Sequence, residues 1–315
     1  MLTIRRLFFA ALCALAVAGC QKSAENDQIV VSISNLSAPY MVMMGRYFEQ
    51  AAQSEGLSVV IMDGQGDSAK QTADLRAADV RGAKAIIVAP NDSRALATAV
   101  DTLQSNGITV IAVDRRLEGT QKPVAYVGAD NVEGGRLLGQ WVVETFPRGA
   151  RVVLITNDPG SSSQIDRSEG VHAGLGKGGT AYPIVAEQTG NSSRDQALTV
   201  TQNILTALGS NLPDVIICLN DDMAMGSLEA IRAARIANGK IKVLGFDATP
   251  EALSRIRSGE MAATVEQNPA MQVRAAVDQA LVALRGKGVA HSASLQPALI
   301  TGANLQMAER FVEAK

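Results

Sequence analysis

A regular alternation of short apolar runs and helix-length segments is the feature that most restricts the fold of this chain. In the first half the runs are Ile29 to Ile33, Leu57 to Met62, Ala85 to Ala89 and Thr109 to Val113. In the second half they are Arg151 to Thr156, Tyr182 to Ala186, Val215 to Leu219 and Ile241 to Phe246. The runs show little regular alternation with polar positions, as is typical of parallel strands buried on both faces. The pattern therefore predicts an α/β fold with two doubly wound parallel-sheet domains.

The length of 315 residues agrees with two domains, and a hydrophobic content of 47% is sufficient for a sizeable core. We expect residues 28–129 and 268–297 to form an N-terminal lobe, and residues 130–267 and 298–315 to form a C-terminal lobe. The chain would cross between the lobes near Asp130, after the late strand Met261 to Glu266, and at the final apolar run Leu295 to Ile300. Three crossings would make a three-strand hinge.

The N-terminus is typical of a secretory signal. Arg5 and Arg6 precede the apolar run Leu7 to Ala18, which is too short to span a membrane. The run ends in Leu-Ala-Val-Ala-Gly-Cys20, which resembles a bacterial lipobox. We interpret residues 1–19 as a lipoprotein signal peptide, Cys20 as the lipid attachment site and residues 20–27 as a tether, with an ordinary signal cleaved nearby as the alternative. The protein would then be exported and anchored to a membrane of the bacterial cell envelope, facing the periplasm or extracytoplasmic space.

Composition and motifs exclude several classes of function. Aromatic residues are only 3%, and 29 Lys plus Arg stand against 31 Asp plus Glu, so a nucleic-acid partner is not expected. With only His172 and His291, a zinc site has little support. The loose glycine motif Gly64 to Ala69 is better explained as a turn, and Ser161 to Ser163 as a turn or helix cap than as a nucleophile. We therefore expect no catalysis, no metal and no cofactor. Cys218, the one cysteine left in the mature chain, is expected to be a buried small hydrophobe.

Polar side chains stand where several of the predicted strands end. They are Ser34, Asp114 with Arg115, Asn220 with Asp221, Asp247 and Gln267. A single acid at such a place is usually a helix cap. In an open parallel sheet, however, ligands bind beyond the carboxyl ends of the strands, so this number of polar strand ends predicts a shared cleft.

The residue types at these positions suit a small neutral polyhydroxy ligand. A carboxylate accepts hydrogen bonds from adjacent hydroxyls, a guanidinium donates in a planar fork, and an amide does both. Asp114 and Asp247 disfavour an anionic ligand, because like charges would be removed from water together.

At these residues the sequence resembles the periplasmic sugar-binding proteins of the ribose-binding type, the receptors of ABC importers, from Gln28 to about Ile300. The segments that carry the resemblance are Ile111 to Arg115, Asp130 to Gly135, Asp166 to Gly170, Asn220 to Gly226 and Gly245 to Pro250. The resemblance implies a type I periplasmic binding protein fold. It also implies that Asp114 and Arg115 of the first lobe meet Arg167, Asn220 and Asp247 of the second, with Gln267 at the hinge and Ser34 as a further polar contact.

The resemblance also places apolar groups in the site, with departures from the family. Tyr40 falls where the family has an aromatic ring against the C–H face of the sugar; the alternative is a helix-start residue that packs on the neighbouring loop. Ala38 replaces an asparagine, Met41 replaces a second aromatic residue, and Ser192 stands at the aromatic position of the second lobe. These changes make the apolar clamp thinner while the hydroxyl-binding groups persist, so the expected ligand is a pentose, hexose or polyol, and ribose is not singled out.

The resemblance implies a monomeric, non-enzymatic receptor whose lobes close around the ligand and which then docks on an ABC permease. A receptor that uses the same cleft to feed a sensor kinase or chemoreceptor, for a sugar or a furanosyl signal, is the alternative that the sequence leaves open.

Overall fold

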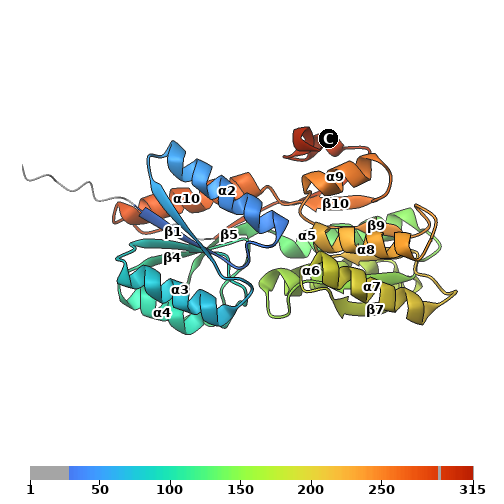
Figure 1. The fold of residues 1–315 in the computed structure, drawn as a ribbon, viewed down its shortest axis with the longest axis horizontal. Coiled ribbons are helices and arrows are strands. Elements are labelled where there is room, and N and C mark those ends of the chain that lie inside the picture. The colour runs from blue at the N-terminus through green and yellow to red at the C-terminus, as the bar shows by residue number, and fades with distance from the viewer. Residues whose placement is uncertain (1–27, 290–291, 315) are drawn as a thin grey trace, which may run out of the picture.

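The computed structural model describes residues 28–289 and 292–314, which form two α/β lobes side by side (Figure 1). The predicted signal peptide 1–19, Cys20 and the tether 20–27 lie outside the described residues. None of the helices in the described part of the chain has the length and apolar character needed to cross a membrane.

The first lobe contains a six-stranded sheet in which every neighbouring pair is parallel. Its order is β11-β5-β4-β3-β1-β2. The strands are β1 (Gln28–Ile33), β2 (Ser58–Asp63), β3 (Ala85–Val88), β4 (Thr109–Val113), β5 (Ala125–Ala129) and β11 (Ala293–Leu295). Helices α2 (Pro39–Ser54) and α10 (Pro269–Leu284) pack on one face, and α3 (Ser68–Val80) and α4 (Ala97–Ser105) on the other, each pair with its own apolar cluster (Figure 1).

The second lobe repeats this plan with the order β12-β10-β9-β8-β6-β7. The strands are β6 (Val152–Thr156), β7 (Ile184–Thr189), β8 (Val215–Cys218), β9 (Lys242–Leu244), β10 (Ala263–Glu266) and β12 (Ala298–Thr301). The α-helices are α5 (Asn131–Thr145), α6 (Ser162–Gly176), α7 (Arg194–Leu208), α8 (Asp221–Ala233) and α9 (Pro250–Arg257), with short turns η1 (Gly179–Ala181), η2 (Leu305–Met307) and η3 (Phe311–Glu313). One continuous apolar cluster forms the core, and the chain passes between the two sheets three times. The predicted α/β class with two doubly wound domains is confirmed.

Several predictions about individual strands were wrong. Strand β5 was not anticipated, because Ala125–Ala129 is short and includes Gly128. The run Leu295 to Ile300 is not one strand: Pro297 separates β11 from β12, which join different sheets, and β12 runs antiparallel to β10. Strands β2 and β7 are half-exposed rather than buried on both faces, because each lies at the edge of its sheet. β7 also begins at Ile184, not at Tyr182.

The expectations that Ser161 to Ser163 form a turn or helix cap and that Cys218 is buried agree with the structure. The Asp67 carboxylate caps α3, the Ser161 hydroxyl caps α6, and Thr249 caps α9 directly before Pro250. Cys218 is a buried free thiol whose Sγ lies 3.3 Å from the Ser227 hydroxyl oxygen. These residues therefore have structural roles, as helix caps or as part of the core.

Glycines bring α5 and α6 together at backbone distance. A Cβ at Gly139 of α5 would lie 2.6 Å from the Val171 carbonyl oxygen, and a Cβ at Gly170 of α6 would overlap the Val132 carbonyl oxygen. This close packing places Arg167 of α6 beside Asn131 of α5, whose side-chain oxygen accepts a hydrogen bond of 2.7 Å from Arg167 Nε. The helix pair thus fixes one of the predicted site residues.

Candidate functional site

Side chains from both lobes converge on one small buried compartment between the two sheets. Its volume is about 30 Å³, and it is lined by Ala38, Tyr40, Met41, Asp114, Arg115, Asn157, Ser163, Arg167, Ser192, Asn220 and Asp247. The structure therefore brings together seven of the nine residues predicted to bind ligand: Tyr40, Met41, Asp114, Arg115, Arg167, Asn220 and Asp247. The two others lie nearby. Ser34 lines the wider mouth of the cleft, and the Gln267 amide donates a 2.7 Å hydrogen bond to Asp247 Oδ1 from behind the compartment.

The strand ends supply the two acids of this compartment through unusual backbone conformations. Asp114 follows β4 with a φ of 62°, and Asp247 comes three residues after β9 with a φ of 116°. Positive φ is costly for a residue with a side chain and is kept where the surrounding structure enforces it. Such turns point both carboxylates into the space between the lobes.

Asn220 and Asp221 follow the same strand but have different roles. Asp221 is 1% exposed and accepts hydrogen bonds from the Thr249 amide at 2.8 Å and the Thr264 hydroxyl at 2.7 Å, so it joins α8 to its neighbours. Burial raises its pKa to about 7, although the threonine hydrogen bonds act in the opposite direction. Asn220 caps α8 through a 2.8 Å hydrogen bond from the Met223 amide and also lines the compartment. The helix-cap interpretation thus holds for Asn220 alone, and of the two residues only Asn220 lines the compartment.

Arg167 is the central cation. Its Nη1 donates a 2.7 Å hydrogen bond to the Leu219 carbonyl and lies 3.6 Å from Asp247 Oδ1, and its guanidinium lies 3.6 Å from the centroid of the Phe246 ring. With the Asn131 contact, these interactions hold a side chain that is 3% exposed in one orientation. A guanidinium fixed in this way can donate to a ligand without losing further side-chain entropy on binding.

Buried polar atoms around the compartment lack hydrogen-bond partners among the described residues. They are Tyr40 Oη, Asp114 Oδ1, Arg115 Nε and Asn157 Oδ1. Burial raises the pKa of the Asp114 carboxyl, and the charges of Arg115 and Arg167 only partly oppose this shift. Because a buried polar group without a partner costs free energy, four such atoms around one space make this space suited to a polar molecule.

Tyr40 lies between the core of the first lobe and the compartment. Its ring belongs to the apolar cluster of the first lobe at the start of α2, and it also lines the compartment. Burial raises the pKa of the phenol well above its usual value, so the hydroxyl stays protonated and can donate to a ligand.

The strand-end pattern and the resemblance missed several residues. Asn157 directly follows β6, so the strand-end rule could have found it. Arg310 carried no sequence signal. Its side chain is fully buried, donates from Nε to the Ala248 carbonyl at 3.1 Å and from Nη2 to the Asp247 carbonyl, and lies 3.6 Å from Glu266. This C-terminal residue therefore holds the backbone that presents Asp247.

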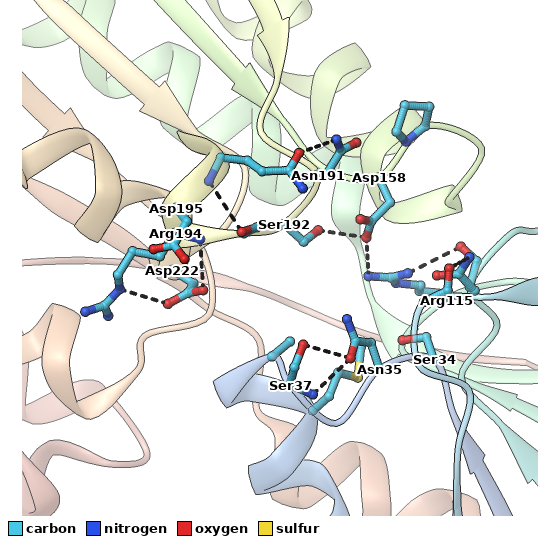
Figure 2. A pocket seen from close by; sticks show the side chains of 17 residues that line it. Ser34, Asn35, Ser37, Arg115, Asp158, Asn191, Ser192, Arg194, Asp195 and Asp222 are labelled. Carbon is cyan, nitrogen blue, oxygen red and sulfur yellow. Dashed lines mark hydrogen bonds and ion pairs between the residues drawn. The ribbon is translucent and has the colours of Figure 1, made fainter. Parts of the chain in front are cut away.

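A wider cleft mouth of about 560 Å³ adjoins the compartment, and Figure 2 shows its polar lining. The first lobe contributes Ser34, Asn35, Ser37 and Asn91, and the second contributes Asn191, Arg194, Asp195 and Asp222. The lobes also touch directly. Arg116 forms an ion pair with Asp166, and its amide donates a 2.8 Å hydrogen bond to the Ser162 hydroxyl. These contacts belong to a closed arrangement of the lobes.

Within residues 28–289 and 292–314, no group of three or more His, Cys, Asp or Glu side chains could hold a metal ion.

Comparison with known proteins agrees with this geometry. Residues 29–288 match the periplasmic binding protein domain family. The ribose import binding protein of Bacillus subtilis is 34% identical over 264 residues, which cover 83% of this chain and 83% of that protein. The ribose import binding protein of Escherichia coli is 30% identical over 278 residues, which cover 88% of this chain and 91% of that protein.

Two solved structures with bound polyol are also similar. The Caulobacter myo-inositol binding protein bound to myo-inositol is 56% identical, with a TM-score of 0.90, and the match covers 92% of this chain and 98% of that one. An ABC transporter solute binding protein from Bacillus halodurans with bound myo-inositol is 26% identical, with a TM-score of 0.84, and the match covers 91% of this chain and 98% of that one.

Proposed function

Because this chain belongs to the periplasmic binding protein family, and within it to the ribose-binding type, we propose that it is the substrate-binding protein of an ABC importer. Its relatives are substrate-binding transport proteins, not enzymes. The proposed ligand is a cyclic polyol or monosaccharide held between the two lobes. The observation that carries this proposal is the set of unpartnered buried polar atoms, contributed by both lobes, around a single compartment.

The chemistry of the compartment supports a neutral ligand with many hydroxyls. Asp114 and Asp247 accept hydrogen bonds from hydroxyls, while Arg115, Arg167 and Asn220 donate to their oxygens. Two buried carboxylates would repel an anion.

Among such ligands, myo-inositol is the first candidate. It carries a hydroxyl on every ring carbon, which suits a compartment with polar groups on several sides. The 56% identity to a protein that was solved with this ligand also supports it. The thin apolar lining at Ala38 and Met41 favours a ring covered with hydroxyls over one with a large apolar face.

Ligand entry requires movement of the lobes. The compartment, at about 30 Å³, has room for about one water, so it is too small for a ring-sized molecule unless the lobes move apart. A ligand that touches both lobes binds the closed form more tightly than the open form and therefore shifts the population toward closure. The permease would recognise the closed surface.

We further propose that acyl chains on Cys20 anchor the exported protein to the membrane, with residues 20–27 as the tether before β1. Two or more acyl chains are sufficient for stable anchoring while the fold stays in water.

A thermal-shift panel tests the ligand class. Residues 20–315 with Cys20 changed to serine are heated with myo-inositol, ribose, allose, xylitol or fructose, with sulfate as an anionic control. A ligand specific to the native state at 100 times its dissociation constant adds about 2.7 kcal/mol of stability, so the melting temperature should rise by several degrees with myo-inositol. No rise with any polyol or sugar would contradict the proposal.

A further inference from the structure

A chain of hydrogen bonds connects the two lobes beside the compartment (Figure 2). Arg115 Nη2 donates a 3.2 Å hydrogen bond to Asp158 Oδ2, and the same oxygen accepts a 2.8 Å hydrogen bond from the Ser192 hydroxyl. Arg115 follows β4 of the first lobe, whereas Asp158 and Ser192 lie in the loops after β6 and β7 of the second. We call these three residues the cleft bridge.

The cleft bridge lies on the boundary between the inner compartment and the cleft mouth. Arg115 and Ser192 line both spaces, whereas Asp158 lines only the mouth. Side-chain exposure falls from 28% at Asp158 to 8% at Arg115. A hydroxyl substituent that extended from the compartment toward the mouth would therefore meet the bridge.

The backbone around Ser192 is strained in a way that directs this residue to Asp158. Asn191 and Ser192 have φ values of 47° and 53°, and two consecutive left-handed residues with side chains are costly. Local hydrogen bonds hold this turn: the Thr189 hydroxyl lies 3.0 Å from Asn191 Oδ1, and the Asn191 side-chain amide donates to Gln196 Oε1 at 2.5 Å. Strain kept at a ligand site points to a role in that site.

The bridge also fixes Arg115 electrostatically. Arg115 Nε lies 3.8 Å from Asp114 Oδ2, and its Nη2 reaches Asp158, so the guanidinium is held between one carboxylate of each lobe. When the lobes separate, the Arg115–Asp158 ion pair must break, because its partners belong to different lobes. Such charge-assisted hydrogen bonds in a partly dry site are stronger than neutral ones.

We propose that the cleft bridge is the closing wall of the ligand site, which restricts the ligand to a single ring without substituents toward the mouth and slows its release. Asp158 acts through Arg115 and Ser192 and is a positioning residue, because it does not line the inner compartment. This inference rests on the proposed function.

The test compares Asp158→Ala with the wild type by stopped-flow dissociation and isothermal titration. The probes are myo-inositol, an O-methyl ether of inositol and a galactosylated inositol. In Asp158→Ala we expect myo-inositol to dissociate about tenfold faster, equivalent to about 1.4 kcal/mol. We also expect the preference for myo-inositol over the two larger probes to shrink at least tenfold.

Two further variants make the test specific. Asp158→Asn keeps an acceptor oxygen and should restore most of the slow release and of the size selection. Glu169→Ala removes an exposed carboxylate from α6 of the same lobe, at a position that lines neither the compartment nor the cleft mouth, and should change neither property more than twofold.

The outcomes distinguish failure of the cleft bridge from failure of the proposed function. Tight binding of myo-inositol by the wild type, with unchanged release and size selection in Asp158→Ala, overturns the cleft bridge and leaves the proposed function standing. No binding of any probe by the folded wild type overturns both. Because Asp158 is partly exposed, the melting temperature of each ligand-free variant should stay within a few degrees of the wild type.

Discussion

Asp114→Ala and Asp247→Ala are each expected to abolish the rise in melting temperature caused by the ligand, while both ligand-free variants stay folded. The two carboxylates come from different lobes, are 2% and 4% exposed, and line the same compartment. A hydrogen bond to a charged group contributes about 1.5–3 kcal/mol, so a carboxylate that accepts two hydroxyls accounts for roughly a hundredfold or more in affinity. Isothermal titration with myo-inositol measures this loss directly.

The fold should survive these substitutions because the buried charges are costly without a ligand. Burial raises the pKa of both carboxyls, and for Asp247 the nearby Asp221 and Asp114 raise it further, whereas Arg167 opposes the shift. Removing either carboxylate removes that cost, and at Asp247 this offsets the loss of the Gln267 hydrogen bond and of the Arg167 ion pair. Asp278→Ala, an exposed position on α10, is the matched control and should bind like the wild type. Wild-type affinity in both site variants would show that the ligand lies elsewhere.

The second large effect is expected from Gly170→Ala, which should lower the stability of the protein. A Cβ there would overlap the Val132 carbonyl oxygen and lie 2.7 Å from the Arg136 amide nitrogen and 2.9 Å from the Gly135 Cα. These are backbone atoms of α5, which cannot rotate away as a flexible side chain would. Overpacking of this kind costs about 1–3 kcal/mol or more, so Gly170→Ala should lower the melting temperature by roughly 6–12 °C if the cost is at the upper end of that range.

The same substitution should also weaken ligand binding, because Arg167 lies one turn before Gly170 on α6. Gly176→Ala is the control on the same helix, since a Cβ at that position meets no atom within 4 Å. Alanine is the better helix former, so that variant should be as stable as the wild type or up to about 1 kcal/mol more stable. Thermal unfolding measures the stability of both variants. A Gly170→Ala variant as stable as the Gly176→Ala variant would contradict the close packing of α5 and α6.

Hydrophobic pattern was sufficient for the fold class because buried parallel strands produce long apolar runs that are easily recognised. It failed where that physical cause is absent. It found strands β2 and β7 but predicted them as buried on both faces, whereas they are sheet edges. It missed the short strand β5, and the change of sheet at Pro297 depends on tertiary pairing. The antiparallel direction of β12 likewise follows from the hinge and not from its own sequence.

The strand-end rule placed Asp114, Arg115, Asn220 and Asp247 at one site because all four follow strands whose carboxyl ends face the cleft. Arg167 was beyond that rule, since it projects from a helix and only the family resemblance indicated it. The positions of Arg310 and Asp158 could not be anticipated, because each depends on a side chain that reaches a segment distant in sequence. The sequence therefore predicts which groups touch a ligand more readily than which groups hold them in place.

The most direct test of the account is a crystal structure of the protein with myo-inositol. Ligand hydroxyls should lie within hydrogen-bonding distance of Asp114 and Asp247 at the same time, with Arg115 and Arg167 donating to hydroxyl oxygens of the ligand. A ligand that contacts only one lobe, or that lies in the cleft mouth away from both carboxylates, would contradict it.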